Sequence, residues 1–479
     1  MRLPSHKTKI VCTIGPASRS EAMLEQLMRL GMNVARLNFA HGTHQGHRED
    51  IQRIRTVAAK LQRHCLIMAD LPGPKMRIGE LLEEPLLLEK GEEAILTVKD
   101  IADAPNKIPV AYKRLPESVT PGDLIFLNDG FIQLRVGKVS GDEVFCQTVI
   151  GGPLLSHKGL SIPGVKIMAE AVSQTDLDFV DFALQEGVDT FGVSFAETAA
   201  DLLKVKEFAR EKGHLAYVVA KIERAEAINN IDEILTAADA IMIARGDMGV
   251  QIPLQDVPSV QKKLIRKANF LGRPVITATQ MLVSMTENIR PTRAEVSDVA
   301  NAILDGTDAV MLSEETAIGR YPAEAVEMIG KIAISTEREE KAIQALADLP
   351  AYFHAEASSG NASVEDVVTL NAVESADALN VRYILTRTQG RAAPCLISRF
   401  RPDSWILSHG GDEKTNNLLS LSYGVHPLSL DNAESSIVDK TATWLVATGM
   451  VAKDEKLIWV EDEASADRLE TLSIKIIKA

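Results

Sequence analysis

The chain repeats one pattern eight times: a short apolar run rich in β-branched residues, followed in most cases by a segment with helical period. This alternation is typical of parallel strands joined by crossover helices. Eight such strands close a (β/α)8 barrel, whose functional residues stand at the carboxyl ends of the strands. We therefore predict an α/β protein built on such a barrel. The expected strands are Lys9–Gly15, Asn33–Phe39, Cys65–Asp70, Thr190–Phe195, Tyr217–Ile222, Ala240–Arg245, Pro274–Thr279 and Ala309–Ser313.

The repeat is interrupted after the third strand. The turn signal Pro72-Gly73-Pro74 opens a stretch of alternating strand patterns and further turns that lacks clear helical period. We predict that residues 72–168 form an inserted β-rich domain, a β-barrel that acts as a lid, and that residues 1–71 and 169–346 form the main barrel. The strands expected in the insertion are Glu93–Val98, Leu124–Leu127, Phe131–Val136 and Glu143–Val149.

A further change of composition occurs at Ser358-Ser359-Gly360-Asn361, which is typical of a linker or domain boundary. The pattern then alternates again, and this predicts a C-terminal α/β domain, residues 347–479, with its own sheet. The expected elements are a helix over Val364–Leu379 and strands over Tyr383–Thr386, Cys395–Ser398, Trp405–Leu407 and Leu457–Val460.

Charge and composition exclude several classes of protein. The chain has 52 Lys and Arg against 66 Asp and Glu, a net charge of −14, which argues against a general nucleic-acid binder. No apolar run approaches the roughly 18 residues of a membrane span, and no signal region precedes the first strand, so we expect a cytoplasmic protein without membrane contact. The four cysteines are far apart in sequence and form no CxxC pair, which favours buried fillers over zinc ligands or disulfides.

Polar residues stand in pairs at the ends of five expected strands. Residues two apart on a strand face the same side, so each pair would point into one mouth of the barrel. A salt bridge could explain one pair, but five buried pairs are costly unless a metal or a charged substrate compensates them. Carboxylates beside lysine and arginine suit a divalent ion bound to a phosphorylated anion. The pairs are Arg36 with Asn38, Lys221 with Glu223, Arg245 with Asp247, Thr277 with Thr279, and Ser313 with Glu315.

The segments around these pairs resemble, in order and spacing, the signature segments of the pyruvate kinase family. The resemblance is strong over roughly residues 7–340 and weaker beyond. It implies Mg2+-dependent (or Mn2+-dependent) transfer of a phosphoryl group from phosphoenolpyruvate to ADP, giving pyruvate and ATP in the final step of glycolysis, by a homotetramer. The segments are Arg36–Gly42, Tyr217–Arg224, Ala244–Gly249, Thr277–Met281, Pro291–Glu295 and Met311–Ala317.

The resemblance also implies a role for each residue at the mouth. Glu223 and Asp247 would hold the divalent metal. Lys221 would neutralise charge on the transferring phosphoryl group and on the enolate, an electrostatic role that fits a loose transition state. Arg36 would hold the phosphoryl group.

The substrate carboxylate would be held by backbone N–H groups around Gly246 and Asp247 and by the Thr279 hydroxyl. Thr279 is thus a third catalytic candidate beside Lys221 and Arg36. Lys158 would belong to the lid that closes over the nucleotide. The residues that the resemblance implies for ADP are Asn38, His41, Arg77 and Lys158. The proton donor to the enolate is not identified, and a water near Thr279 is our hypothesis.

Departures from the family pattern bear on monovalent cations. Ala40 replaces a usual serine, and Lys75 replaces the glutamate of potassium-activated members. The resemblance implies an enzyme of the bacterial type. Because the ammonium of Lys75 could supply the positive charge of the ion near Asn38 and Asp70, we predict that this enzyme does not require K+.

Two other departures lie elsewhere. Gln251 replaces a usual glutamate, with no consequence that we can assign. The phosphate loop of the C-terminal domain, Thr386–Ala392, carries an extra residue and lacks its last hydroxyl. This predicts weak activation by fructose 1,6-bisphosphate, and leaves the effector itself open.

Two alternative functions share part of this pattern. A metal-dependent lyase of aldolase type would share the metal carboxylates but lack a nucleotide lid, and the insertion with Lys158 argues against it. A non-catalytic regulatory paralogue would usually lose the lysine or a metal ligand, whereas Lys221, Glu223 and Asp247 are all present.

Overall fold

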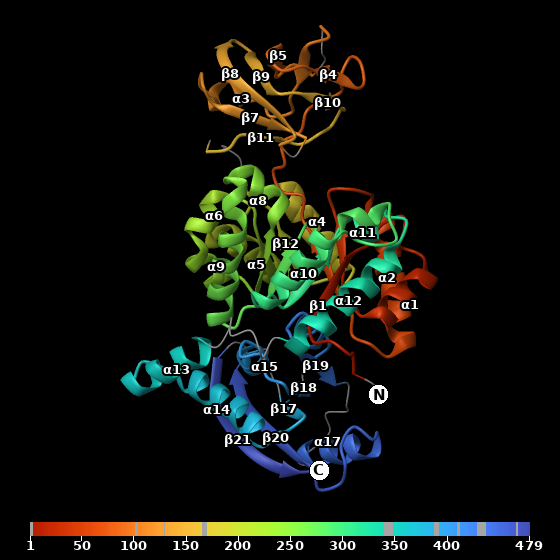
Figure 1. Cartoon of the computed structure of the whole chain (residues 1–479), viewed down its shortest axis with the longest axis vertical. Coiled ribbons are helices and arrows are strands. Elements are labelled where there is room, and N and C mark those ends of the chain that lie inside the picture. Colours follow the sequence, from red (N-terminus) through yellow and green to blue (C-terminus); the bar gives the residue numbers. More distant parts are fainter. Residues whose placement is uncertain are drawn as a thin grey trace.

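The computed structural model describes residues 3–100, 104–128, 130–164, 170–339, 348–387, 392–409, 412–428, 437–465 and 468–479. Three parts lie one above another along the long axis of the molecule (Figure 1). A barrel ringed by helices occupies the middle, a β-rich domain projects beyond one end of it, and an α/β domain covers the other end. No helix among the described residues is both long and apolar enough to cross a membrane.

The central barrel is closed by eight parallel strands in the order β1-β16-β15-β14-β13-β12-β3-β2. All eight predicted strands are confirmed, with ends that differ by at most two residues. The strands are β1 (Lys9–Thr13), β2 (Met32–Asn38), β3 (Leu66–Asp70), β12 (Thr190–Val193), β13 (Tyr217–Ile222), β14 (Ala240–Ala244), β15 (Val275–Ala278) and β16 (Ala309–Leu312).

The barrel interior is filled by alternate residues of these strands. Val34, Met68 and Val219 are buried in one apolar cluster inside the barrel. Because side chains two apart on a strand share a face, Arg36, Asp70 and Lys221 point into the same interior, one layer nearer the carboxyl ends. The strand period therefore places charged groups directly above an apolar floor.

Helices surround the barrel, and several begin at side-chain caps that satisfy their first N–H groups. Ser173 with Asp176 and Thr292 with Glu295 form capping boxes at the starts of α4 and α10. The helices of this part are α1 (Glu21–Leu30), α2 (His44–Leu61), α4 (Gln174–Gln185), α5 (Ala199–Glu211), α6 (Ala225–Asn229), α7 (Ile231–Ala237), α8 (Arg245–Gln251), α9 (Val257–Phe270), α10 (Arg293–Leu304), α11 (Glu314–Ala317) and α12 (Pro322–Glu339), with 3-10 turns η1 (Leu254–Asp256) and η2 (Val283–Thr286).

The inserted segment forms a β-rich domain with an apolar core of its own. A six-stranded sheet has the order β11-β7-β8-β9-β5-β6, and β10 pairs with β4. Its two edges are linked through isolated bridges, Arg77 with Gly159 and Ile78 with Val110, next to β11 and β6. The elements are β4 (Leu86–Leu88), β5 (Glu93–Thr97), β6 (Lys107–Pro109), α3 (Leu115–Ser118), β7 (Leu124–Leu127), β8 (Ile132–Ser140), β9 (Glu143–Ile150), β10 (Gly152–Leu154) and β11 (Leu160–Ser161).

The C-terminal domain has a five-stranded sheet in the order β19-β18-β17-β20-β21, in which only the β20–β21 pair is antiparallel. The helices are α13 (Asp348–Ser359), α14 (Val364–Ala378), α15 (Ala392–Ser398), α16 (Glu413–Leu419) and α17 (Ile437–Ala447); the strands are β17 (Tyr383–Arg387), β18 (Trp405–His409), β19 (Val425–Leu428), β20 (Lys456–Ser465) and β21 (Arg468–Lys478).

Two predictions for this domain were wrong. Cys395–Ser398 lies in α15 rather than in a strand, because so short an apolar run fits either structure and Pro394 is tolerated in the first turn of a helix. Ser358 and Ser359 end α13, and Gly360 and Asn361 lie in the turn before α14, so this segment is not a linker. The two helices pack together through Phe353 and Leu370. The expected boundaries at 168/169 and 346/347 and residues 388–391 of the phosphate loop lie outside the described residues.

The C-terminal domain also closes the amino-terminal end of the barrel. Leu421, fully buried, belongs to the cluster inside the barrel. Nearby, the Tyr423 N–H donates to Asp308 Oδ1 at 2.9 Å, and Lys9 Nζ donates to the Val425 carbonyl at 2.6 Å. One end of the barrel is thus blocked, and the other faces the inserted domain (Figure 1).

Candidate active site

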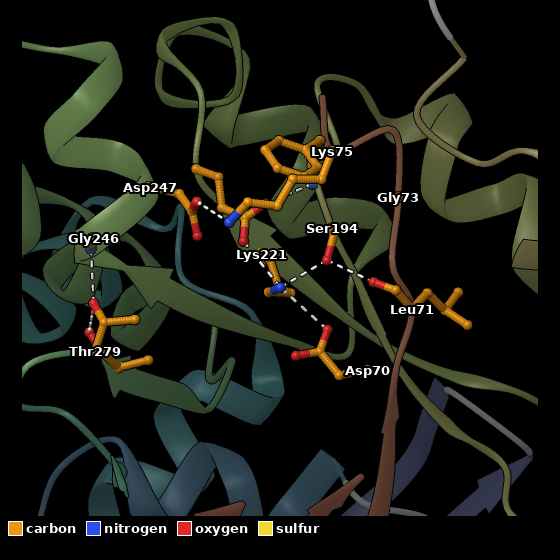
Figure 2. A network of polar contacts seen from close by, with 12 residues as sticks. Asp70, Leu71, Gly73, Lys75, Ser194, Lys221, Gly246, Asp247 and Thr279 are labelled. Atoms are coloured by element: carbon orange, nitrogen blue, oxygen red, sulfur yellow. Dashed lines mark hydrogen bonds and ion pairs between the residues drawn. The ribbon is translucent and has the colours of Figure 1, made fainter. Parts of the chain in front are cut away.

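A buried lysine lies at the centre of the open mouth. Lys221 Nζ donates to Ser194 Oγ at 2.7 Å and lies 3.0 Å from Glu223 Oε1 and 3.2 Å from Asp70 Oδ1 (Figure 2). Burial alone would lower the pKa of this ammonium, but the two carboxylates outweigh it and raise the pKa. Lys221 is therefore charged throughout the physiological range.

Arg36 and Asp70 form a second ion pair beside this lysine. Arg36 Nε and Nη2 both lie 2.6 Å from Asp70 Oδ2, and Nη1 donates to Thr13 Oγ1 at 2.9 Å. Burial would raise the pKa of Asp70, but Arg36 and Lys221 outweigh it, so the pKa is lowered. Asp70 is thus an anion shared by two cations, and it holds both of them at the floor of the mouth.

Ser194 is a site residue that sequence reasoning missed. Its hydroxyl accepts from Lys221 Nζ and donates to the Leu71 carbonyl at 2.7 Å (Figure 2). Leu71 is the last residue before the inserted segment, so this serine joins the lysine to the entrance of the lid. The strand period could have indicated this residue. Ser194 is two residues beyond Gly192, which pairs with Asp70 on the neighbouring strand, so Ser194 faces the same side as Gly192.

Glu223 is buried deep in the mouth. Its Oε1 faces Lys221, and its Oε2 accepts the Phe195 N–H at 2.8 Å. Burial raises the pKa of Glu223; Lys221 opposes this shift and the nearby Asp247 carboxylate adds to it. The two carboxylates are thus close enough to repel each other.

Asp247 lies in the first turn of α8, and about a third of its side chain (31%) is exposed at the mouth. Its Oδ1 lies 3.2 Å from Lys75 Nζ (Figure 2). The structure therefore gives Lys75 a contact with Asp247, rather than with the Asp70 or Asn38 side chain with which the sequence grouped it. Asp70 is taken by Arg36 and Lys221, and Asn38 Oδ1 accepts the Ala40 N–H at 3.2 Å.

Glu223 and Asp247 fit a hard divalent cation. Glu223 is buried and Asp247 is partly exposed, and two such neighbouring carboxylates are the oxygen donors that Mg2+ and Mn2+ prefer. No group of three or more His, Cys, Asp or Glu ligands occurs in the described part of the chain.

Thr279 and Gly246 meet on the other side of the mouth. The Gly246 N–H donates to Thr279 Oγ1 at 2.8 Å, and this hydroxyl donates to the Ala278 carbonyl at 2.6 Å (Figure 2). Thr279 has φ +68°, which is rare for a β-branched residue. Arg245 stabilises this conformation by donating to the Thr279 carbonyl at 2.7 Å.

Thr277 and Thr279 do not face the same side, although they are two residues apart, because the backbone of Thr279 has a positive φ. Ile276 and Ala278 fill the barrel interior, so Thr277 faces outward and its Oγ1 donates to Thr307 Oγ1 at 2.9 Å. The expectation that Thr277 points into the mouth was wrong. Thr279 reaches the mouth because its left-handed backbone, with φ +68°, breaks the alternation of the strand.

Two more charged residues expected at the mouth have structural contacts instead. Arg245 pairs with Asp298 at 2.8 Å. Glu315 is buried and accepts the N–H groups of Leu282 at 3.0 Å and Ser313 at 2.7 Å. Both stabilise the loops around the site, since each satisfies groups that would otherwise be buried without partners.

The residues predicted for the nucleotide come from both parts, Asn38 and His41 from the barrel and Arg77 and Lys158 from the inserted domain. Arg77 Nη1 donates to the His157 carbonyl at 3.1 Å, next to Lys158. Burial lowers the pKa of His41, and the nearby charges of Arg77, Arg36 and Lys75 lower it further. The mouth is thus lined by positive charge where the inserted domain meets it, which suits a polyphosphate.

Comparison with known proteins agrees with this geometry. The family model described as pyruvate kinase, barrel domain, matches residues 5–326, and that described as pyruvate kinase, alpha/beta domain, matches residues 366–477. The chain belongs to the pyruvate kinase family. It is therefore a kinase of the type that acts on phosphoenolpyruvate and ADP.

Individual members of the pyruvate kinase family match over most of their length. A pyruvate kinase of Thermococcus litoralis is 46% identical over 479 residues, all of both chains. One of Staphylococcus epidermidis is 40% identical over 474 residues, 98% of this chain and 80% of that protein. The crystal structure of a pyruvate kinase from Cryptosporidium parvum superposes with a TM-score of 0.89 at 33% identity, covering 99% of this chain and 96% of that one.

Proposed function

We propose that the chain performs the family's reaction at the open mouth of the barrel, with Mg2+ or Mn2+ held by Glu223 and Asp247. The observation that carries this proposal is the charged, buried Lys221 between two carboxylates, facing the inserted domain. A preorganised cation in a site shielded from water stabilises charge that develops as a phosphoryl group leaves. Bound at Glu223 and Asp247, the metal would neutralise oxygens of the substrate.

The chain's own residues would divide the substrate between them. Arg36 would bind the phosphoryl group and Lys221 the oxygen from which it departs. Gly246 N–H, Asp247 N–H and the Thr279 hydroxyl would bind the carboxylate. In the free enzyme the first and the last of these groups are hydrogen-bonded to each other, and the carboxylate would take the place of that bond. The phosphoryl group passes to a β-phosphate oxygen of ADP, and the enolate takes a proton at carbon, from a water near Thr279, to give pyruvate.

We propose that residues 72–168 act as a lid over the nucleotide, with residues 1–71 and 169–346 as the catalytic barrel and residues 347–479 as the C-terminal domain. The positive charge where barrel and insertion meet supports this. The nucleotide-binding residues of this proposal are Asn38, His41, Arg77 and Lys158.

We propose that the enzyme is of bacterial type and works without potassium. The Asp70 oxygens already contact Arg36 and Lys221, the Asn38 oxygen accepts an N–H group, and Ala40 offers no hydroxyl. Activity should be similar in potassium chloride and in tetramethylammonium chloride at equal ionic strength. Lys75→Glu should create a potassium requirement, because it removes the ammonium that could supply the positive charge of the ion. A loss of more than about tenfold in the wild type without K+ would contradict the proposal.

We also propose a cytoplasmic homotetramer, assembled through the barrel and the C-terminal domain, which is the assembly that the resemblance implies. Light scattering after size-exclusion chromatography measures the mass of the assembly directly. A dimer or monomer at micromolar concentration would contradict this assignment.

The function is tested by an assay in which pyruvate formation is coupled to a dehydrogenase, with phosphoenolpyruvate, ADP and Mg2+. Lys221→Met should lower turnover by about 10²- to 10³-fold or more, because it removes a preorganised charge from a buried position. Lys331→Met, which removes an exposed i,i+4 ion pair on α12, is the matched control and should leave turnover unchanged. Pyruvate formation without ADP would favour a lyase, and a Lys221→Met enzyme with a tenth of normal turnover would refute the assigned role.

A further inference from the structure

Lys75 is held at a fixed point of the chain where the barrel leads into the inserted domain. Gly73 N–H donates to Asp176 Oδ1 at 3.0 Å, and the Lys75 N–H donates to the Gly73 carbonyl at 2.9 Å. A Cβ on Gly73 would lie 2.9 Å from Ser194 Cβ, and Gly73 itself has φ +61°. This close approach admits only glycine, so the root of the Lys75 side chain has little freedom.

From this point the Lys75 side chain reaches across the mouth to Asp247 (Figure 2). The Nζ–Oδ1 distance is 3.2 Å, and the two side chains are 33% and 31% exposed. Glu223 is also engaged: Lys221 faces one of its oxygens and the Phe195 N–H donates to the other. Three carboxylate oxygens of the proposed metal site are thus already paired within the chain.

An ammonium and a divalent cation cannot both lie against the same carboxylate oxygen without strong repulsion. Lys221 is buried below the metal carboxylates and is fixed by Ser194 and Asp70. Lys75 differs, because its ammonium is partly exposed and stands on a flexible stem that can swing into solvent. Of the two lysines, Lys75 is the one that a metal could displace.

We propose that Lys75 is a tethered cation that pairs with Asp247 in the free enzyme and competes with the divalent metal for this carboxylate. The inference rests on the proposed metal site. It predicts that metal binds weakly to the free enzyme and gains affinity when a substrate contributes further oxygens. It also predicts that metal binding releases Lys75, whose charge then becomes available to other anions in the mouth.

The test measures Mn2+ binding to the full-length enzyme without substrates, from the electron paramagnetic resonance signal of free Mn2+. Lys75→Met should tighten Mn2+ binding by about three- to tenfold, because it removes a competing ion pair and a repelling charge. Lys75→Gln should behave alike, and Lys75→Arg should bind Mn2+ as weakly as the wild type. Arg77→Met is the matched control, since it removes a neighbouring charge that contacts the His157 carbonyl and not Asp247.

Each outcome decides the matter. Tighter binding in Lys75→Met and Lys75→Gln, with less than a twofold change in Arg77→Met, supports the proposal. An equal effect in Arg77→Met would show a general field of charge, and no effect in either Lys75 variant would exclude competition; both overturn it. Asp247→Asn distinguishes a failure of the proposed metal site from a failure of the Lys75 inference. Undiminished Mn2+ binding in this variant would refute the metal site and, with it, the inference.

Discussion

Replacing Ser194 by alanine tests whether the position of the catalytic lysine limits the reaction. The Ser194 hydroxyl is buried, receives a 2.7 Å hydrogen bond from the Lys221 ammonium and donates one of 2.7 Å to the Leu71 carbonyl. A hydrogen bond to a charged group contributes about 1.5–3 kcal/mol. Glu223 and Asp70 remain as partners of the lysine, so we expect a loss of about 1.4–2.7 kcal/mol in the transition state, or about ten- to hundredfold in kcat.

The measurement is kcat and KM for phosphoenolpyruvate in the coupled assay, together with the free energy of unfolding. Ser398→Ala is the matched control, because Ser398 is equally buried and donates to the Tyr423 carbonyl at 2.7 Å, but lies in the C-terminal domain. Both variants should lose similar stability, and only Ser194→Ala should lose kcat. If Ser194→Ala kept more than half of the wild-type kcat, the serine would have no positioning role.

Three further predictions concern other parts of the molecule. Glu223→Gln and Asp247→Asn should each raise the Mg2+ concentration needed for half-maximal activity; unchanged dependence in both would place the metal elsewhere. Burial lowers the pKa of His426 from 6.5 to about 3. Between these two pH values the unfolded chain binds a proton that the folded chain does not, so the free energy of unfolding decreases as the pH is lowered. The wild type should lose about 3 kcal/mol more than His426→Leu between pH 6.5 and pH 4 in urea titrations, and parallel curves would refute this. Micromolar fructose 1,6-bisphosphate should shift the phosphoenolpyruvate saturation curve little, and a large shift would contradict the interpretation of the altered loop.

The barrel could be predicted because its strands are buried on both faces and read as short apolar runs between turns. The same alternation correctly grouped Arg36, Lys221 and Glu223, whose positions follow from the strand period alone. The period fails where a strand ends. Thr277 and Thr279 are two residues apart, but the left-handed backbone at Thr279 breaks the alternation. A threonine gives no sign in the sequence that its backbone will be left-handed.

Contacts between distant segments could not be predicted either. Ser194 meets a carbonyl 123 residues away, and Lys75 meets a carboxylate 172 residues away. Such pairs depend on how the insertion leaves the barrel, which local patterns do not encode. The family pattern marks Lys75 as unusual, but it does not predict Asp247 as the partner of this lysine.

The buried Leu421 has a consequence for how the chain can be divided. A catalytic barrel is often treated as a module that can be cut out and grafted, but here a side chain from the last domain fills its amino-terminal end. Removing that domain would open a hole in the apolar interior. It would also remove the Val425 carbonyl from Lys9 and the Tyr423 N–H from Asp308. A displacement of the C-terminal domain would therefore act first on β1 and on the start of β16, through Lys9 and Asp308, at the end of the barrel opposite the mouth.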